Sequence, residues 1–275
     1  MAIRLIVNAD DYGRTPAVSE GIRRAHLQGV VTSTTAMMNM PGVEEALKLA
    51  LRETPKLGLG VHLVLTSGAP LLPLAQIPSL VTAEGRFAGL AGFFELLPGL
   101  NPDEAEAEWR AQIERFVAAT GKKPDHLDSH HHSSFFTPAL FRRMCALARE
   151  YGCAIRFPGD SNTAALMDGL PQAMIDETLR AFPVTLLEFK PRHPDCFLSS
   201  FYDADATLEN LLDMIAMLNE GTAELMCHPG LVDKALLAGS VYNRQREREL
   251  AVLTAPEARK ALAVRGARLT SFGEL

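Results

Sequence analysis

The segment Ile3-Arg-Leu-Ile-Val-Asn-Ala-Asp-Asp11 places a short, mostly aliphatic run directly before a group of polar side chains. Residues 3–7 are typical of a buried strand. Residues 18–27 then have helical spacing, which brings Ile22 and Ala25 to one face. A buried strand followed by an amphipathic helix is the repeating unit of parallel sheets, so this stretch predicts an α/β fold.

The same alternation continues along the chain. Further strands are predicted at residues 31–40, 57–65, 126–129, 154–157, 184–189, 223–227 and 268–272. Helices are predicted at residues 43–51, 102–119, 138–150, 208–218, 244–253 and 256–263. Two of these helices begin at a proline that follows a capping side chain, Asn101 in one and Thr137 in the other. About eight strands alternating with helices favour a closed or nearly closed (β/α) barrel over an open doubly wound sheet.

The size and charge of the chain limit its classes of function. Its 275 residues, 47% of them hydrophobic, suffice for one large core, so we expect a single domain over residues 1–275, although two smaller domains also fit the length. The net charge of -6 gives no electrostatic reason to expect nucleic acid or an anionic membrane as partner. The longest uncharged run, residues 57–83, contains prolines and glycines, which favours a strand and a loop over a membrane helix.

The four cysteines are scattered along the chain, and none belongs to a C-x-x-C pair. This spacing excludes a zinc ribbon and a thioredoxin-type motif. The first apolar run ends at Asn8, too early for the apolar region of a secretory signal. We therefore expect a cytoplasmic protein whose thiols are reduced.

Side chains able to do chemistry occur where predicted strands end. Asp10 and Asp11 follow the first strand, and His62 lies near the end of the third. His130 and His228 follow residues 126–129 and 223–227. The carboxyl ends of parallel strands converge on one mouth of a barrel, so we expect these groups to meet in space.

The Asp10-Asp11 pair and the histidine run each have two interpretations. Adjacent carboxylates can divide the work, one binding a cation and the other acting as a base, but a lone pair is more often a helix cap. In Asp128-Ser-His-His-His132, alternation predicts that His130 and His132 face the pocket while His131 faces away. Asp128 would fix the tautomer of a histidine ligand. A surface tract that binds metal adventitiously is the alternative.

His62 and His228 carry little information alone, because an isolated histidine is more often structural than catalytic. Cys227 precedes His228, which raises the alternative of a Cys-His nucleophile. Neighbouring residues on a strand point to opposite faces, so we expect no hydrogen bond between these two side chains.

Several motifs in a fixed order resemble the YdjC family of carbohydrate deacetylases, and most closely its chitooligosaccharide (chitin disaccharide) deacetylase branch. The motifs are Val7-Asn-Ala-Asp-Asp-Tyr-Gly13, Val31-Thr-Ser-Thr-Thr-Ala36, Gly60-Val-His62, His126-Leu-Asp-Ser-His-His-His132, Met226-Cys-His-Pro-Gly230 and Tyr242-Asn-Arg-Gln-Arg246. The resemblance implies a distorted or incomplete TIM-like barrel, a homodimer, and a divalent metal held by Asp11, His62 and His130. Ser133-Ser-Phe-Phe136 stands where that branch has a further histidine, so the sugar stays open.

The resemblance implies that the protein is a hydrolase that removes N-acetyl groups from a small amino sugar or chitooligosaccharide. Metal-activated water would attack the amide, with Asp10 as general base and His228 as general acid. We expect Asp195 to support the charged form of His228. The resemblance favours magnesium, whereas two imidazole ligands favour zinc or another transition metal.

Two other functions use the same residue types. A metallohydrolase of phosphoesters or non-sugar amides would need basic groups for phosphate, and Arg14 and Arg156 are the basic residues we place near the mouth. A non-catalytic sugar-binding protein would have a decayed site, which the intact set of Asp10, Asp11 and the three histidines speaks against.

Overall fold

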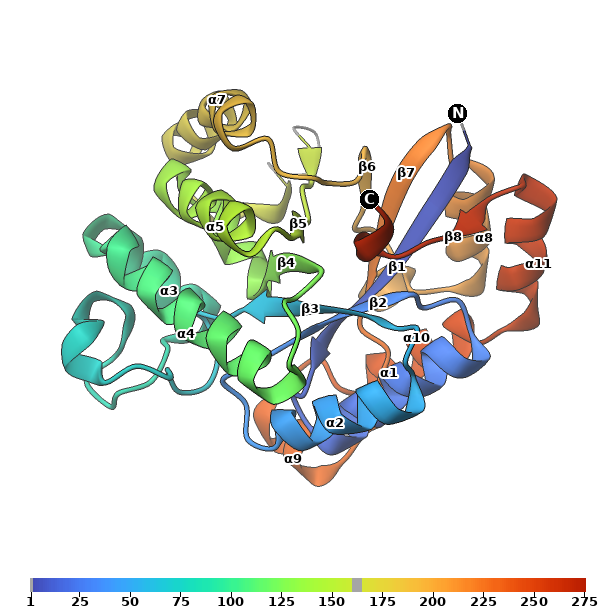
Figure 1. Cartoon of the computed structure of the whole chain (residues 1–275), viewed down its shortest axis with the longest axis horizontal. Helices are drawn as coiled ribbons and strands as arrows, with labels where there is room; N and C mark the ends of the chain where they lie inside the picture. Colours follow the sequence, from blue (N-terminus) through green and yellow to red (C-terminus); the bar gives the residue numbers. More distant parts are fainter. Residues whose placement is uncertain (1, 160–164) are drawn as a thin grey trace.

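The computed structural model describes residues 2–159 and 165–275, and a parallel sheet that curls on itself forms its centre (Figure 1). The strands are β1 (Ile3–Tyr12), β2 (Ser33–Ala36), β3 (Gly58–Leu63), β4 (His126–Ser129), β5 (Ala154–Ile155), β6 (Cys196–Leu198), β7 (Gly221–Cys227) and β8 (Arg268–Leu269). They lie in the order β5-β4-β3-β2-β1-β7-β6, and β8 pairs with the start of β1. Every paired couple of these strands is parallel, as the βα pattern predicts.

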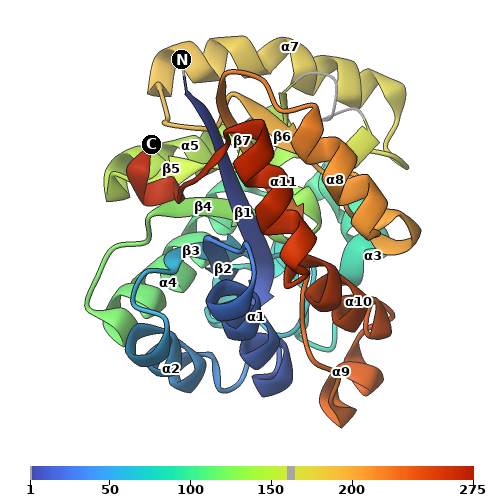
Figure 2. The same cartoon turned by 90° about the vertical axis from the view of Figure 1, so that its right-hand side faces the viewer.

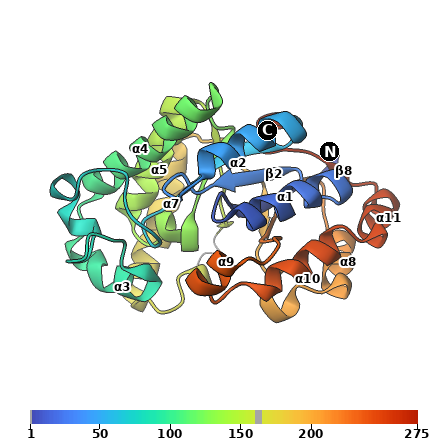
Figure 3. The same cartoon turned by 90° about the horizontal axis from the view of Figure 1, so that it is seen from below.

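Helices surround the sheet on its outer side, which Figures 2 and 3 show from two further directions. They are α1 (Pro16–Gln28), α2 (Val43–Glu53), α3 (Gly89–Leu96), α4 (Pro102–Thr120), α5 (Pro138–Tyr151), α7 (Gln172–Phe189), α8 (Leu208–Ala216), α9 (Lys234–Gly239), α10 (Arg244–Leu253) and α11 (Pro256–Arg265). The side chains of Asn101 and Thr137 cap α4 and α5, as predicted. No helix among the described residues is long and apolar enough to cross a membrane.

The barrel is incomplete, because β5 and β6 end the strand order without pairing with each other. A hydrogen bond from the Ile155 N–H to the Arg192 carbonyl, 2.9 Å long, links β5 to the segment that leads into β6. The expected incomplete TIM-like barrel is thereby confirmed. The side chain that follows β5, Arg156, extends over the Phe197 ring of β6 and reaches Glu224 of β7.

Alternate residues of β1 divide the outer core from the barrel interior. Leu5, Val7 and Ala9 belong to the main hydrophobic core, which they share with the surrounding helices. Ile6 belongs instead to a small separate cluster with Ala154 and Phe272. Asn8 and Asp10 follow Ile6 on the same face, since strand side chains alternate. The interior therefore has an apolar floor and becomes polar toward the mouth.

One predicted strand is wrong. Residues 184–189 form the last part of α7, and the strand of this region, β6, comes afterwards and was missed. The apolar run is misleading because Val184 and Leu187 are exposed, at 65% and 74%, on the outer side of the helix. The buried residues of α7 follow helical spacing instead: Ile175, Thr178, Phe182, Thr185 and Phe189.

Candidate active site

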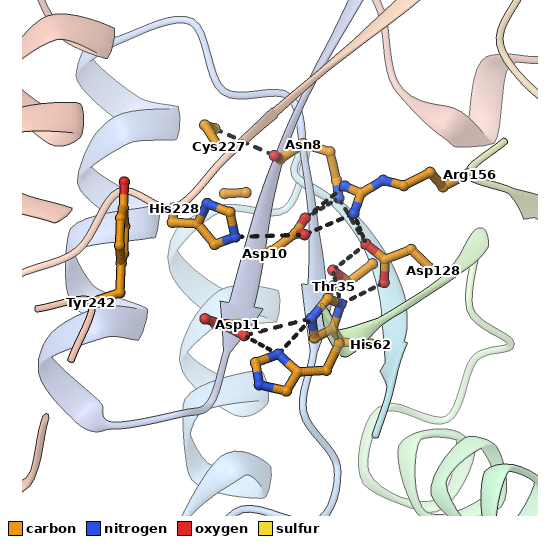
Figure 4. Close-up of polar contacts among 12 residues, drawn as sticks. Asn8, Asp10, Asp11, Thr35, His62, Asp128, Arg156, Cys227, His228 and Tyr242 are labelled. Atoms are coloured by element: carbon orange, nitrogen blue, oxygen red, sulfur yellow. Dashed lines mark hydrogen bonds and ion pairs between the residues drawn. The ribbon is translucent and has the colours of Figure 1, made fainter. Parts of the chain in front are cut away.

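A β-bulge brings Asp10 and Asp11 to the same place. The β1–β2 register pairs Ala9 with Thr34 and then Tyr12 with Ala36, so two residues of β1 lie opposite one residue of β2. Asp11 has a φ of 71°, in the left-handed region. The bulge ends the alternation of side chains, and both carboxylates reach the surroundings of His62 (Figure 4).

Asp11, His62 and His130 converge on one point. Asp11 Oδ1 lies 3.5 Å from His62 Nε2 and 3.2 Å from His130 Nδ1. The two histidine nitrogens are 3.3 Å apart. All three residues are buried, and Asp11 Oδ1 has no hydrogen-bond partner among the described residues. This donor set and the unpartnered oxygen fit a cation, because a buried polar atom otherwise finds a hydrogen bond.

Asp128 orients His62 from the side opposite Asp11. Its Oδ1 lies 2.7 Å from His62 Nδ1, and its Oδ2 accepts a 3.0 Å hydrogen bond from the Thr35 hydroxyl. Burial lowers the pKa of His62, but the carboxylates around it, Asp128 foremost and then Asp10 and Asp11, together outweigh burial and raise it overall. With Nδ1 donating to a carboxylate, the lone pair of Nε2 points at the convergence point. The tautomer-fixing role expected for Asp128 thus has its partner in His62.

The histidine run does not continue β4 as a strand. β4 ends at Ser129, and a short 3-10 segment, η4 (His130–Phe135), follows, in which His131 and His132 have positive φ. The strand alternation behind the prediction that His131 faces away therefore does not hold: its ring stacks on His130 at 3.9 Å between centroids, and the residue is exposed. His132 packs edge-on against Phe197 of β6, with 6.0 Å between centroids. Strand alternation fails here because the chain has already left the sheet.

Arg156 forms ion pairs with three carboxylates in the barrel interior. It binds Asp10 through two contacts of 2.7 Å, and it also contacts Asp128 at 3.1 Å and Glu224 of β7 at 2.8 Å. Burial alone would raise the pKa of Asp10, but Arg156 outweighs it and holds the pKa well below its usual value. Burial raises the pKa of Glu224 to about 7 despite the same guanidinium. Asp10 is consequently a fixed, fully ionised carboxylate.

Arg246 is a site residue that sequence reasoning left without a role. It lies at the end of the motif Tyr242-Asn-Arg-Gln-Arg246, on α10, and forms a buried ion pair with Asp11 Oδ2. Burial alone would raise the pKa of Asp11, but Arg246, His130 and Arg14 together outweigh burial and hold this pKa well below its usual value. The pair leaves Oδ1 of Asp11 free to face the histidines. A helix far from the strand ends gives no sequence signal of this contact beyond the motif itself.

His228 lies across the mouth from the His62 group, beside two tyrosines. Its Nε2 is 3.9 Å from Asp10 Oδ2, and its ring packs edge-on against Tyr202 and Tyr242 at 5.5 and 5.6 Å. Burial lowers the pKa of His228 to about 4, against the opposing effect of Asp10. The Cys227 thiol points away to the Asn8 carbonyl, as strand alternation predicts.

The prediction that Asp195 supports His228 is wrong. Asp195 accepts a hydrogen bond from the Thr222 N–H at the start of β7, whereas His228 follows the other end of that strand. Glu249 of α10 holds the backbone at this position instead, because it accepts a hydrogen bond from the His228 backbone N–H, while the ring Nδ1 has no hydrogen-bond partner among the described residues. Asp195 precedes β6, a strand absent from the sequence prediction, so its place at the bottom of the barrel could not be foreseen.

Comparisons with known proteins agree along the whole chain. A family model described as YdjC-like protein matches residues 4–264. A carbohydrate deacetylase of Brevibacillus brevis is 39% identical over 274 residues, 99% of this chain and 100% of the relative. A chitooligosaccharide deacetylase of Salmonella paratyphi B is 36% identical over 271 residues, 98% of this chain and 97% of the relative. These relatives confirm the predicted enzyme class, a carbohydrate deacetylase.

Solved structures confirm the fold. An Enterococcus faecalis protein, provisionally described as a cellobiose-phosphate cleavage protein, superposes with a TM-score of 0.86 at 36% identity and covers 100% of this chain and 99% of its own. A family 4 carbohydrate esterase from Streptomyces lividans shares the fold alone, with a TM-score of 0.52 at 10% identity over 97% of this chain and 91% of its own. On the strength of the full-length family match and these relatives, the chain belongs to the YdjC-like protein family.

Proposed function

We propose that this chain is a metal-dependent hydrolase that removes N-acetyl groups from small amino sugars or chitooligosaccharides. The observation that carries the proposal is the convergence of Asp11, His62 and His130 around one unpartnered carboxylate oxygen. Asp10 and His228 flank this point, each within reach of a substrate held there. The names of the relatives, carbohydrate deacetylase and chitooligosaccharide deacetylase, supply the class of substrate.

Asp11 Oδ1, His62 Nε2 and His130 Nδ1 would hold a divalent cation. When bound, the cation would supply Lewis-acid activation of water and of the acetyl carbonyl group. The three atoms lie 3.2–3.5 Å apart. This separation is close to the value of about 3.3 Å that bonds of about 2.0–2.1 Å give in a tetrahedral site. The geometry and the two imidazoles favour zinc or another transition metal, and the family resemblance favours magnesium.

Asp10 is the general base in this proposal. Arg156 holds both of its oxygens, so the carboxylate keeps one orientation and stays ionised at neutral pH. A carboxylate of such low pKa is a weak base, so proton removal depends on a water made more acidic by the cation, and the proton then passes on readily to a more basic group. The proton is needed at the amide nitrogen, because an amine anion is too poor a leaving group to depart unprotonated.

His228 is the group that delivers this proton. Its Nε2 lies 3.9 Å from Asp10 Oδ2, a gap that the substrate nitrogen or one water can bridge. Burial keeps the imidazole neutral at pH 7 in the free protein. Negative charge that develops on the attacked amide stabilises the protonated ring. As the C–N bond breaks, the proton passes to nitrogen and the free amine leaves.

A pair of stacked tyrosines beside His228 fits a sugar ring. Tyr202 and Tyr242 are nearly parallel, with 4.5 Å between centroids and 7° between planes. Tyr202 is 44% exposed, although it is a large aromatic residue in the loop after β6, at the mouth. Pockets for small molecules use such aromatic walls together with a few polar groups. The C–H face of an amino sugar would stack on Tyr202 and bring its acetamide toward Asp10.

The test is acetate release from N-acetylglucosamine and from its β-1,4-linked dimer by metal-stripped protein reloaded with Mg²⁺ or Zn²⁺. A phosphoester substrate in the same assay tests the metallohydrolase alternative. Asp10→Asn should keep metal affinity and lower kcat by roughly 10²–10⁴-fold, the usual loss of a general base. Asp11→Asn, its matched neighbour, should lose the metal itself.

Calorimetric titration with the metal separates these two roles. Acetate release from neither sugar, with turnover of the phosphoester, would favour the alternative. Equal loss of metal in both variants would show that the two carboxylates do not divide the work as proposed.

A further inference from the structure

Asn8 and His126 belong to the quoted motifs, yet the proposed reaction does not use them. With Asp125 they form a hydrogen-bonded chain below Asp10. The Asn8 amide nitrogen donates to Asp10 Oδ1 at 3.0 Å and approaches Asp128 Oδ2 at 3.4 Å. Asn8 Oδ1 lies 3.1 Å from His126 Nε2, and His126 Nδ1 lies 2.5 Å from Asp125 Oδ1. Asn8 and His126 are fully buried, and 21% of the Asp125 side chain is exposed.

The donors and acceptors of this chain fix the protons of His126. The NH2 half of the Asn8 amide must face the carboxylates of Asp10 and Asp128, because the carbonyl oxygen in that place would be repelled by both. Asn8 Oδ1 therefore accepts from His126 Nε2–H. The other nitrogen, Nδ1, faces the partly exposed carboxylate of Asp125, which in its ionised form can only accept a hydrogen bond. Both ring nitrogens then carry hydrogen, which makes His126 an imidazolium ion.

The packing around His126 suits a buried cation. The Phe272 ring lies parallel to the imidazole, with 3.8 Å between centroids and 8° between planes, and so presents its electron-rich face. Two glycines of β3 make the room: a Cβ on Gly60 would lie 2.5 Å from His126 Nδ1, and one on Gly58 would lie 2.7 Å from Asp125 Oδ2. The His126–Asp125 pair therefore occupies space that β3 leaves open by having glycine at these two positions.

We propose that Asp125 and a protonated His126 hold the Asn8 side chain in one orientation, and that Asn8 thereby positions the base Asp10. The inference rests on the proposed function for the role of Asp10. Arg156 fixes Asp10 from the β5 side, and Asn8 fixes the same Oδ1 atom from below. Asn8, His126 and Asp125 are positioning residues, since none of them is placed against the reacting amide.

A test of position uses Asp125→Asn, which keeps the size and the acceptor oxygen but removes the charge that supports His126. We expect kcat to fall roughly 10–100-fold, as for other outer partners of a site, with KM and metal affinity little changed. Asp195→Asn is the matched control, because Asp195 is a carboxylate at the same end of the barrel that binds the Thr222 N–H. Because Asp195 does not belong to the hydrogen-bonded series of Asn8, His126 and Asp125, this control should leave kcat within about twofold of wild type.

A second measurement does not depend on turnover. Nitrogen NMR of ¹⁵N-histidine-labelled protein at pH 7.5, without metal and with Zn²⁺, should show one imidazole with both nitrogens protonated. Phe272→Leu identifies that ring as His126, because the stacked phenyl ring shifts its signals. A neutral His126 ring, or a kcat of Asp125→Asn equal to that of Asp195→Asn, overturns the proposal. Failure of the proposed function itself would appear separately, as no acetate release by the wild-type protein.

Discussion

Glu249 supports His228 from behind, and its burial gives it a measurable effect on stability. Its carboxylate accepts hydrogen bonds from the His228 backbone N–H and from the Tyr242 hydroxyl. Burial raises the pKa of Glu249 from 4.5 to about 7. A carboxyl group whose pKa is raised on folding contributes stability that is fully present below pH 4.5, and this contribution is lost as the pH rises through 7.

Glu249→Gln should therefore change the slope of stability against pH. Between pH 5 and 7, the free energy of unfolding of the metal-free wild type should fall relative to the variant by about 1 kcal/mol per pH unit. Denaturant unfolding at several pH values measures this difference. Glu247→Gln, at an exposed position of the same helix, is the control and should stay at a constant offset from wild type. A constant offset for Glu249→Gln as well would show that Glu249 is ionised throughout.

At the residue scale, sequence reasoning finds side chains that follow strands and misses those that come from elsewhere. Asp10, Asp11, His62, His130 and His228 all meet at one mouth, because strand ends converge. Arg246 comes from a helix, and Glu224 lies within a strand with its side chain turned inward. Neither position differs in sequence from an ordinary surface or core charge. Their roles follow from contacts with Asp11 and Arg156 that appear only in the folded molecule.

Two glycines let α1 pack directly against the turn that carries His228. A Cβ on Gly21 of α1 would lie 2.5 Å from Gly230 Cα and 2.6 Å from Gly230 C. The same turn is tied to the helix by a 3.2 Å hydrogen bond from the Leu231 N–H to the Ala17 carbonyl. The backbone atoms cannot move apart without shifting His228, which stands two residues before Gly230.

Gly21→Ala should therefore act on catalysis as well as on stability. In an open helix this change would stabilise by about 1 kcal/mol, but overpacking here should destabilise by about 1–3 kcal/mol. We also expect kcat to fall roughly tenfold or more, because His228 is displaced, while metal affinity is kept. Thermal unfolding and acetate release measure the two effects. Gly239→Ala, where a Cβ meets nothing within 4 Å, is the control; equal behaviour of both variants would refute the argument.

Among the elements, those with strong periodicity and clear ends were predicted well. β4 has the predicted bounds, and α10 has them too. The last part of α7 was not, because Val184 and Leu187 present apolar side chains to solvent and so imitate a buried strand. The bulge in β1 was also missed, since no glycine marks its left-handed residue, Asp11.

For the whole molecule, the single domain over residues 1–275 stays a prediction that unfolding can test. We expect one calorimetric transition for the metal-free protein and one, at higher temperature, with bound metal. A free metal concentration of 100 times Kd should stabilise the fold by about 2.7 kcal/mol. Asp11→Asn should abolish this shift. Two separate transitions in the metal-free protein would contradict a single domain.

The barrel architecture itself was predictable, because parallel βα units leave few alternatives once about eight strands are counted. The incomplete closure was implied by the family resemblance and not by the strand pattern. Only the folded molecule shows that Arg156, which follows β5, joins Asp10 on one strand to Glu224 on another.

The left-handed backbone at Asp11, His131 and His132 has a consequence for directed evolution. Among the described residues, these are three of the five non-glycine positions with positive φ. Such conformations are strained for side chains with a Cβ, by roughly 1–3 kcal/mol each, and glycine relieves the strain. A laboratory selection for heat resistance alone would thus be drawn to these positions first. His131→Gly is the clearest case, because Asp11→Gly would also leave the buried Arg246 without its carboxylate: the surviving lineages would gain melting temperature by discarding the ring that stacks on the proposed ligand His130.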